Sequence, residues 1–422
     1  MIDIKLIREN PEDIKKKIAR KGAEASLIDE VLLLDRNRRR LLGECERAQS
    51  ELNNISKDIS QLHGQQKIDA INSASLFSDK VRKLKPELDQ AEKEFSEVMF
   101  KIPNPPATDV IDGKSDKDNT VNRKWGEPPK FDFTPLDHVE LGKKLDIIDI
   151  ERAVKIAGTR FYFLKNEAVL LEFALIQYAF KTLMKEKFIP MIPPVLLNRA
   201  TMEGAGYLPA GEDEIYKTQD ESYLAGTSEQ PLAGYHKDET IDESKLPIRY
   251  AGFSTCFRRE AGSYGKDVRG ILRVHQFDKV EMFSFVKPED AEKEHEYLVD
   301  LEEKLMQGLK IPYQVINICT GDLGAPAVKK FDIEAYLPGE GKYRETHSCS
   351  NCTDFQARRL GIKYKNKTGE SDYLYTLNGT AFSIGRPIIA ILENYQQKDG
   401  SVLMPEILHE FLPFKEIKTK TE

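Results

Sequence analysis

Long apolar runs are missing from the 422-residue sequence. Apolar stretches such as 169–171 fall far short of the ~20 residues that a membrane-spanning helix needs. The opening residues, MIDIKLIREN, have no apolar core of the kind that a secretory signal carries. From these absences we expect a cytoplasmic protein with no membrane contact.

Cysteine is scarce, with five residues that are widely scattered and odd in number. That pattern argues against a framework of disulfides. Cys349 and Cys352 form one CxxC pair, but no second pair or histidine-rich segment supplies the other ligands of a structural zinc site. We therefore interpret this pair as loop packing or chance.

A surplus of positive charge is absent as well, since the net charge is −7 at pH 7. Proteins that bind nucleic acid usually show a basic footprint, so any such contact must come from local patches. Loops of the GxxxxGK and GxGxxG types are also absent. A nucleotide site of the P-loop or Rossmann kind is thereby excluded.

The composition, with 40% hydrophobic and 32% charged residues, is that of a soluble globular protein long enough for two or three domains. Apolar residues recur every three or four positions from Leu34 to Leu62 and again from Ala70 to Ile102. This heptad pattern is typical of a two-stranded coiled coil. It predicts an antiparallel helical hairpin over about 27–102, with arms about 50 Å long and a local kink or a lost hydrogen bond at Pro86.

Such a hairpin is too thin to hold a core of its own and should project from an N-terminal domain of residues 1–102. It could act as a coiled coil for dimerisation or scaffolding, or it could bind a partner. Acidic residues along it are about as numerous as basic ones. The basic residues of interest are Arg36, Arg38, Arg39, Arg40, Lys80, Arg82 and Lys83. The prolines that follow Ile102 end the helical pattern, which predicts a linker over 103–134 and a second domain over 135–422.

The segment 253–285 predicts two strands joined by a glycine-rich, cationic loop. Alternation places Arg258 and Glu260 on one face of the first strand, and Phe277 and Glu281 on one face of the second. A solvated surface is the plainer interpretation of these mixed charges. A nucleotide site explains the pattern better, because the loop suits a polyanion. Phe277 would stack on a base, Arg258 would bind a phosphate and Glu260 would accept from an amino group.

The runs FRRE at 257–260 and RVHQF at 273–277 resemble motif 2 of the class II aminoacyl-tRNA synthetases, and in detail the seryl-tRNA synthetases. Four further segments resemble the family's pattern in the same order. They are the helical segment 167–187 with the following FIPMIPPVLLN (motif 1), TSE at 227–229, the E-x-x-S run at 345–348, and LNGTAFSIGR at 377–386 (motif 3). Each segment alone is weak evidence for the family, but all of them together, in this order, are highly specific for it.

The resemblance implies an α+β fold, in which the antiparallel coiled-coil hairpin precedes a class II catalytic domain built on a mostly antiparallel sheet flanked by helices. It implies a homodimer formed through motif 1. It also implies that L-serine is activated with ATP and Mg²⁺ and transferred to the 3′ end of tRNA(Ser), and it leaves open whether tRNA(Sec) is charged. The hairpin would grip the long variable arm of the tRNA.

The same resemblance assigns site residues. Arg258 and Arg386 would be catalytic, and Glu345 and Ser348 would bind Mg²⁺. The ATP site would comprise Arg258, Arg259, Glu260, Val274, Phe277, Glu345, Thr346, His347, Ser348 and Arg386. The serine site would comprise Thr227, Ser228, Glu229, Arg258, Glu281, Asn378 and Thr380. The tRNA would contact the basic residues of the hairpin together with Lys266 and Arg269. His347 departs from the family, in which a serine is commonest at this position, and we do not interpret it as a zinc ligand.

These residue types suit the reaction, in which the serine carboxylate attacks the α-phosphorus of ATP. The enzyme must align two substrates and neutralise phosphate charge, and it needs no nucleophile of its own. Arginine suits this task because its fork binds two oxygens at once. Glu281 is the candidate to accept from the serine hydroxyl, since a site that binds a hydroxyl rejects the analogue lacking it by ~10⁴.

Three alternatives stay open at this point. They are another class II synthetase, such as one for threonine, proline or histidine, a ligase that charges a protein carrier, and an inactive RNA-binding paralogue. The long hairpin argues against the first two. The presence of Arg258, Glu260, Glu281 and Arg386 argues against the third.

Overall fold

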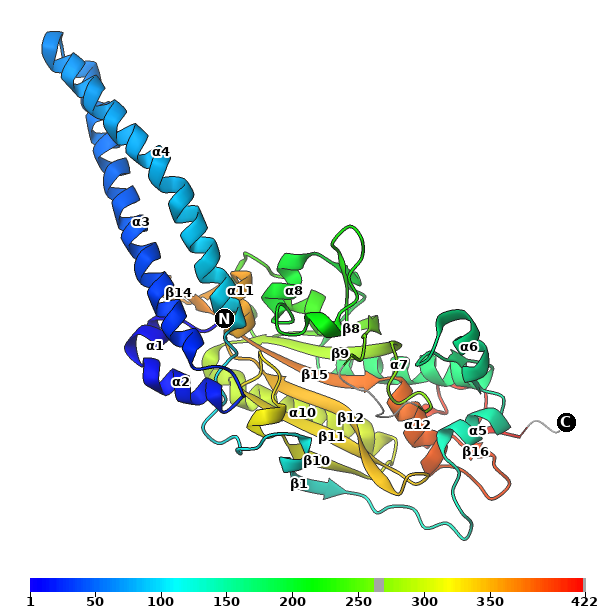
Figure 1. Ribbon diagram of the computed structural model, residues 1–422. Helices are drawn as coiled ribbons and strands as arrows, with labels where there is room; N and C mark the ends of the chain where they lie inside the picture. The colour runs from blue at the N-terminus through cyan, green and yellow to red at the C-terminus, as the bar shows by residue number, and fades with distance from the viewer. Residues whose placement is uncertain (262–268, 420–422) are drawn as a thin grey trace. The chain divides into compact units, whose positions relative to one another are not determined.

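The computed structural model describes residues 1–261 and 269–419 (Figure 1). The chain divides into two compact units, one of Ile2–Pro103 and one of Asn104–Glu422 with Met1. No helix among the described residues has both the length and the apolar character needed to cross a membrane.

The smaller unit is helical. Helices α1 (Ile4–Glu9) and α2 (Pro11–Ala19) precede α3 (Ser26–Asp58) and α4 (Gly64–Lys101), which lie side by side as an antiparallel hairpin (Figure 1). Buried Leu41, Leu84, Leu88 and Ala91 form part of its seam, so the predicted coiled-coil hairpin is confirmed. Pro86 does not end α4, although proline has no N–H to give to the helix.

An eight-stranded sheet organises the larger unit. Its order is β1 (Thr120–Trp125), β10 (Tyr313–Asn317), β11 (Lys329–Leu337), β12 (Lys342–Asn351), β15 (Tyr375–Ser383), β9 (Gln276–Val286), β8 (Ile248–Phe257) and β4 (Ile189–Met191). Within this sheet of described residues the neighbours run antiparallel, except for the parallel pair of β8 and β4. The predicted fold class, α+β on a mostly antiparallel sheet, is confirmed.

Helices α7 (Glu167–Lys185), α10 (Ala291–Gly308) and α12 (Gly385–Asn394) pack on the sheet and form the main core with it. Val280 and Met282 of β9 point into this core together with Phe382 of β15. Because strand side chains alternate, the residues directly before and after Val280 point to the opposite face of the sheet. That face is free to line a cavity.

The remaining elements surround the sheet. A second, smaller core joins α8 (Arg199–Ala205), α9 (Glu229–Ala233) and α11 (Phe355–Leu360) to β7 (Thr240–Asp242) and the ends of β8 and β9. The other short elements are α5 (His138–Lys144), β2 (Ile148–Asp149), α6 (Ile150–Ala157), β3 (Phe163–Leu164), β5 (Leu196–Leu197), β6 (Tyr223–Leu224), β13 (Lys363–Lys365), β14 (Ser371–Tyr373), β16 (Val402–Leu403) and β17 (Glu416–Ile417).

Two sequence expectations need correction. β8 ends at Phe257 and β9 begins at Gln276, so Arg258 and Glu260 lie beyond the strand on which they were expected. The chain leaves the ladder here because the Arg259 N–H donates to the Glu214 carbonyl and Glu260 has a φ of +52°. The predicted linker 103–134 is also partly structured, since it contains β1, which pairs with β10.

Candidate active site

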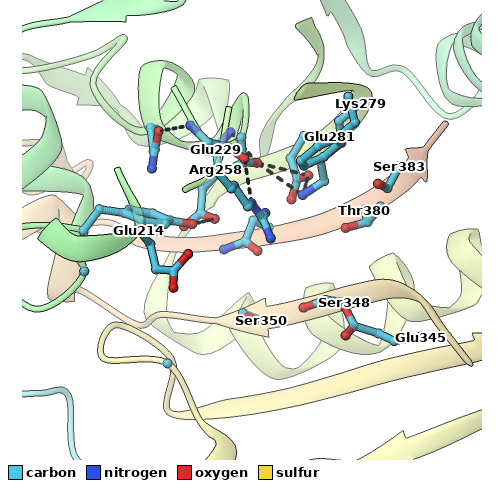
Figure 2. A pocket seen from close by; sticks show the side chains of 18 of the residues that line it. Glu214, Glu229, Arg258, Lys279, Glu281, Glu345, Ser348, Ser350, Thr380 and Ser383 are labelled. Atoms are coloured by element: carbon cyan, nitrogen blue, oxygen red, sulfur yellow. Dashed lines mark hydrogen bonds and ion pairs between the residues drawn. The ribbon is translucent and has the colours of Figure 1, made fainter. Parts of the chain in front are cut away.

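A cavity of about 660 Å³ lies on the face of the sheet opposite the main core (Figure 2). Strands β9, β15 and β12 form its floor, and the start of α9 together with loops from several parts of the chain form its walls. The floor residues are Phe277, Lys279, Glu281, Asn378, Thr380, Ser383, Glu345, Thr346, Ser348 and Ser350. The wall residues include Tyr207, Glu214, Thr227, Glu229, Arg258 and Glu260. Residues of the predicted ATP site and of the predicted serine site therefore line one cavity.

Two irregularities of pairing explain which floor residues face the cavity. In β12, Glu345 pairs with Glu334 while His347 pairs with Ile333, so Thr346 is an extra residue. The extra residue lets Glu345 and Ser348, three positions apart, face the same side. A matching shift in β15 between Thr380 and Phe382 brings Thr380 and Ser383 to the cavity together.

His347 points away from the cavity, although the resemblance implied a role in ATP binding. Its side chain is buried, its ring lies 5.7 Å from that of Phe382, and its Nδ1 lies 2.8 Å from the Thr346 hydroxyl. Burial lowers the pKa of His347 to about 3, so the ring is neutral. The resemblance assigned every residue of the run 345–348 to the ATP site. Side chains along a strand alternate between the two faces of the sheet, so they cannot all point toward the cavity.

Ser228 and Arg259 also lie outside the cavity lining. The buried Ser228 hydroxyl donates to the Gly252 carbonyl at 3.0 Å and lies 2.9 Å from the Ser254 hydroxyl, which ties α9 to β8. Arg259 is exposed. Arg269 is exposed as well and forms an ion pair with Asp137 at 3.0 Å, while Lys266 lies outside the described residues.

One end of the cavity gathers buried acids around a lysine. Lys279 forms an ion pair with Glu281 and donates to the Thr227 hydroxyl at 3.2 Å (Figure 2). Glu229 accepts from the Tyr207 hydroxyl at 2.7 Å and from the Gln356 amide at 2.9 Å. Burial raises the pKa of both Glu229 and Glu281, and Lys279 opposes that rise.

The other end gathers guanidinium groups. Arg258 lies 5.3 Å from the centre of the Phe277 ring, and its Nε donates to the Gly226 carbonyl at 3.2 Å. Arg386 pairs with Glu345 at 3.0 Å. Partial burial raises the pKa of Glu345, whose side chain is 44% exposed, but Arg386 and the other nearby cations outweigh that effect and bring it to about 2. Glu345 is therefore ionised and holds Arg386 in the cavity.

Several cavity residues were missed from the sequence. Strand alternation puts Lys279 on the same face of β9 as Phe277 and Glu281, but the sequence analysis gave it no role in the site. Tyr207, Glu214 and Lys330 come from distant segments and carry no recognisable local pattern. Among the residues that the structure describes, no group of three or more His, Cys, Asp or Glu side chains could hold a metal ion.

Comparison with known proteins shows the family of this chain. The model of the seryl-tRNA synthetase N-terminal domain matches residues 1–106, and that of the tRNA synthetase class II core domain (G, H, P, S and T) matches residues 214–395. The serine–tRNA ligase of Dictyoglomus turgidum is 47% identical over 424 residues, which cover 100% of both chains. The chain belongs to the seryl-tRNA synthetases, the serine–tRNA ligases of class II.

Three further relatives of this chain are consistent with the same fold and the same family. The serine–tRNA ligase of Thermobifida fusca is 43% identical over 98% of this chain and 97% of its own. The seryl-tRNA synthetase of Pyrococcus horikoshii, solved in complex with ATP, has a TM-score of 0.91 and 41% identity over 100% of both chains. The cytoplasmic serine–tRNA ligase of Naegleria fowleri, in complex with AMP, has a TM-score of 0.86 and 36% identity over 100% of this chain and 99% of its own. The predicted family and enzyme class are confirmed, against the three alternatives.

Proposed function

We propose that this cavity activates L-serine with ATP and passes the serine to the 3′ end of tRNA(Ser). The observation that carries the proposal is the meeting of Arg258, Phe277, Glu281 and Arg386 around one cavity. Two solved relatives contain ATP or AMP, which supports an adenine nucleotide as the ligand.

At the guanidinium end, Phe277 would stack on the adenine, and Arg258 would bind the α-phosphate and the serine carboxylate. Arg386 would bind the γ-phosphate, with Glu260 and Val274 beside the base. Both arginines stay charged throughout, so they neutralise the oxygens as charge develops on them. Their anchors, the Gly226 carbonyl for Arg258 and Glu345 for Arg386, hold the groups ready for an in-line attack by the carboxylate.

At the acidic end, Thr227 and Glu229 would bind the ammonium group of serine. Glu281 would accept from its hydroxyl, with Thr380 and Asn378 alongside. A buried carboxylate left without that hydroxyl would penalise alanine in the same pocket. We assign no substrate contact to Ser228, Arg259 or His347, because their side chains lie outside the cavity lining.

Magnesium fits the donor set of Glu345 and Ser348, which both line the cavity with oxygen atoms. Mg²⁺ typically keeps one or two protein carboxylates and takes its other ligands from phosphates and water. When bound, it would neutralise phosphate charge beside Arg386.

The exposed basic residues of α3 and α4 would contact the tRNA. Arg39, Arg40 and Arg47 border a shallow groove on α3. Arg36, Lys80, Arg82 and Lys83 are exposed too. Arg38 differs, because its guanidinium lies over the Phe95 ring at 4.7 Å and pairs with the buried Asp35. Comparative charging of tRNA(Ser) and tRNA(Sec) transcripts would decide whether both are substrates.

A homodimer would cover the apolar side chains that remain exposed on motif 1. On α7 these are Leu170, Phe173 and Met184, and on the β4 segment they are Ile189 and Ile192, the last 81% exposed. Exposed apolar side chains that gather on one segment are typical of interfaces, which supports the proposed dimer. Sedimentation at equilibrium should give twice the chain mass of 48.1 kDa. A monomer at micromolar concentration would contradict this, and cell fractionation would test the predicted cytoplasmic location.

The decisive experiment is serine-dependent ATP–pyrophosphate exchange with the Glu281→Ala variant. We expect kcat/KM for serine to fall by about 100-fold or more, because the hydroxyl loses a buried charged acceptor. ATP binding, measured by calorimetry, should be unchanged. Normal exchange in the variant, or exchange in the wild type with an amino acid other than serine, would overturn the proposal.

A further inference from the structure

Lys279 occupies two of the acceptors that the proposed function gives to serine, Thr227 and Glu281. Its ammonium group pairs with Glu281 (Figure 2) and donates to Thr227. The side chain is only 9% exposed. The Thr227 hydroxyl in turn lies 3.4 Å from the Glu281 carboxylate. A buried lysine ammonium thus sits where the ammonium and hydroxyl of serine are expected to bind.

The charges around this position balance. Among the described residues, Glu229 and Glu281 contribute two negative charges and Lys279 one positive charge at the acidic end, and Arg258 of the guanidinium end supplies a second positive charge near enough to lower the pKa of Glu281. Serine enters as a zwitterion with no net charge, so the balance survives its binding. Without Lys279 the same pocket would carry one net negative charge. A buried site of that kind takes up a proton, which would make one of its carboxylates a neutral acid.

We propose that Lys279 is a positioning residue for serine, which orients Glu281 and keeps it ionised so that it accepts from the serine hydroxyl. This inference rests on the proposed function of the cavity and extends it to a residue outside its substrate contacts. Lysine suits the task because its single point charge can serve Thr227 and Glu281 at once. When serine binds, its ammonium takes over Thr227 and Lys279 stays with Glu281.

Other titratable groups face Glu281 and Lys279 from each neighbouring element. Cys256 of β8 is buried, and burial raises its pKa to about 11, so it stays a neutral thiol. Glu302 of α10 lies beneath the sheet, where burial raises its pKa well above the ordinary value. From the loops, Arg258 adds positive charge and Tyr207 donates to Glu229. Among these groups, Lys279 is the cation in direct contact with Glu281.

The test is the pH dependence of kcat/KM for serine in pyrophosphate exchange with the Lys279→Met variant. We expect a loss of about 100-fold near pH 7, because a buried carboxylate has lost its charge partner. The rising limb of the pH profile should move up by about 1–3 pH units, since a neighbouring cation lowers a carboxyl pKa by that amount. KM for ATP should stay within about threefold.

Lys279→Arg keeps the charge and should keep the limb at the wild-type pH even if its bulk lowers the rate. Lys287→Met is the matched control, because Lys287 pairs with Glu289 at the same two-residue spacing outside the cavity. It should leave the profile unchanged. If Lys279→Met does not fold, as judged by its thermal melt, Lys279→Gln carries the same expectation.

If the rising limb of the pH profile stays at the wild-type pH in both Lys279→Met and Lys279→Gln, the inference is overturned, even where activity is reduced. Lys279 would then have a packing role only. A wild-type enzyme that does not activate serine would instead refute the proposed function. The two failures are therefore distinguishable.

Discussion

Ion pairs of the helical hairpin and of the cavity differ in their exposure to water. On the hairpin, Arg82 and Asp79 form a pair at 2.7 Å with side chains 80% and 51% exposed. In the cavity, the side chains of Lys279 and Glu281 are 9% and 1% exposed. Exposed pairs contribute about 0–1 kcal/mol, whereas removing one partner of a buried pair costs about 3–5 kcal/mol. Replacing a single charge on the hairpin is therefore expected to cost less than replacing one in the cavity.

The largest expected effect separates two adjacent arginines of motif 2. Arg258→Ala should lower kcat for serine-dependent pyrophosphate exchange by about 10²–10³-fold, because the proposed role of the lost guanidinium is to stabilise charge that develops on the α-phosphate. Arg259→Ala should stay within about threefold, since that side chain is exposed and outside the cavity. Exchange assays on both variants decide the point. Equal losses of kcat in the two variants would show that a position in the cavity lining does not distinguish catalytic residues from others.

A second prediction concerns acid stability. Burial lowers the pKa of His347 to about 3, so the folded protein keeps it neutral while the unfolded chain takes up a proton below about pH 6.5. His347 thus supports folding fully above pH 6.5, and that support falls by about 1.4 kcal/mol per pH unit as the pH drops toward 3. His347→Gln should flatten this part of the profile.

Urea unfolding at pH 7, 5.5 and 4 would measure the effect. His63→Gln is the control, because this histidine is exposed at the tip of the hairpin. Its profile should follow the wild type. If the free energy of unfolding falls equally with pH in the wild type and in His347→Gln, the prediction is wrong. The contrast between buried groups of the larger unit and exposed groups of the hairpin would then be weaker.

The smallest expected effect lies on the hairpin. Arg39→Ala should lower kcat/KM for aminoacylation of tRNA by about three- to tenfold and reduce the salt dependence by about one charge, because it would remove one of the proposed phosphate contacts. Serine activation without tRNA should not change. Arg38→Ala should instead lower the melting temperature, since Arg38 packs on Phe95 and pairs with Asp35. A loss of serine activation in Arg39→Ala would contradict this assignment.

Local patterns predicted much of this fold. The heptads of α3 and α4 and the alternation along β9 were readable because each depends on neighbours a few residues apart. Phe277 and Glu281 accordingly share the cavity. The extent of β8 was predicted wrongly, because the end of a strand depends on which distant backbone groups compete for its hydrogen bonds. The Glu214 carbonyl, which accepts from Arg259, lies 45 residues earlier in the chain.

The site was predictable as a set of segments but not as a set of side chains. The extra residue at Thr346 decides that Glu345 and Ser348 face the cavity and that His347 does not. Such a register shift arises from pairing between two strands, and neither strand encodes it alone. The partners of Glu229, which are Tyr207 and Gln356, likewise come from separate parts of the chain.

The order of its residues alone determined this protein's helical hairpin, its family and the segments that build the cavity, because periodicity and motif chemistry are local properties. Tertiary structure alone decided which side chains meet. It placed Lys279 between Thr227 and Glu281, and it turned His347 into the core. The physical reason is that strand register, burial and the pairing of buried charges are settled only when distant segments come into contact.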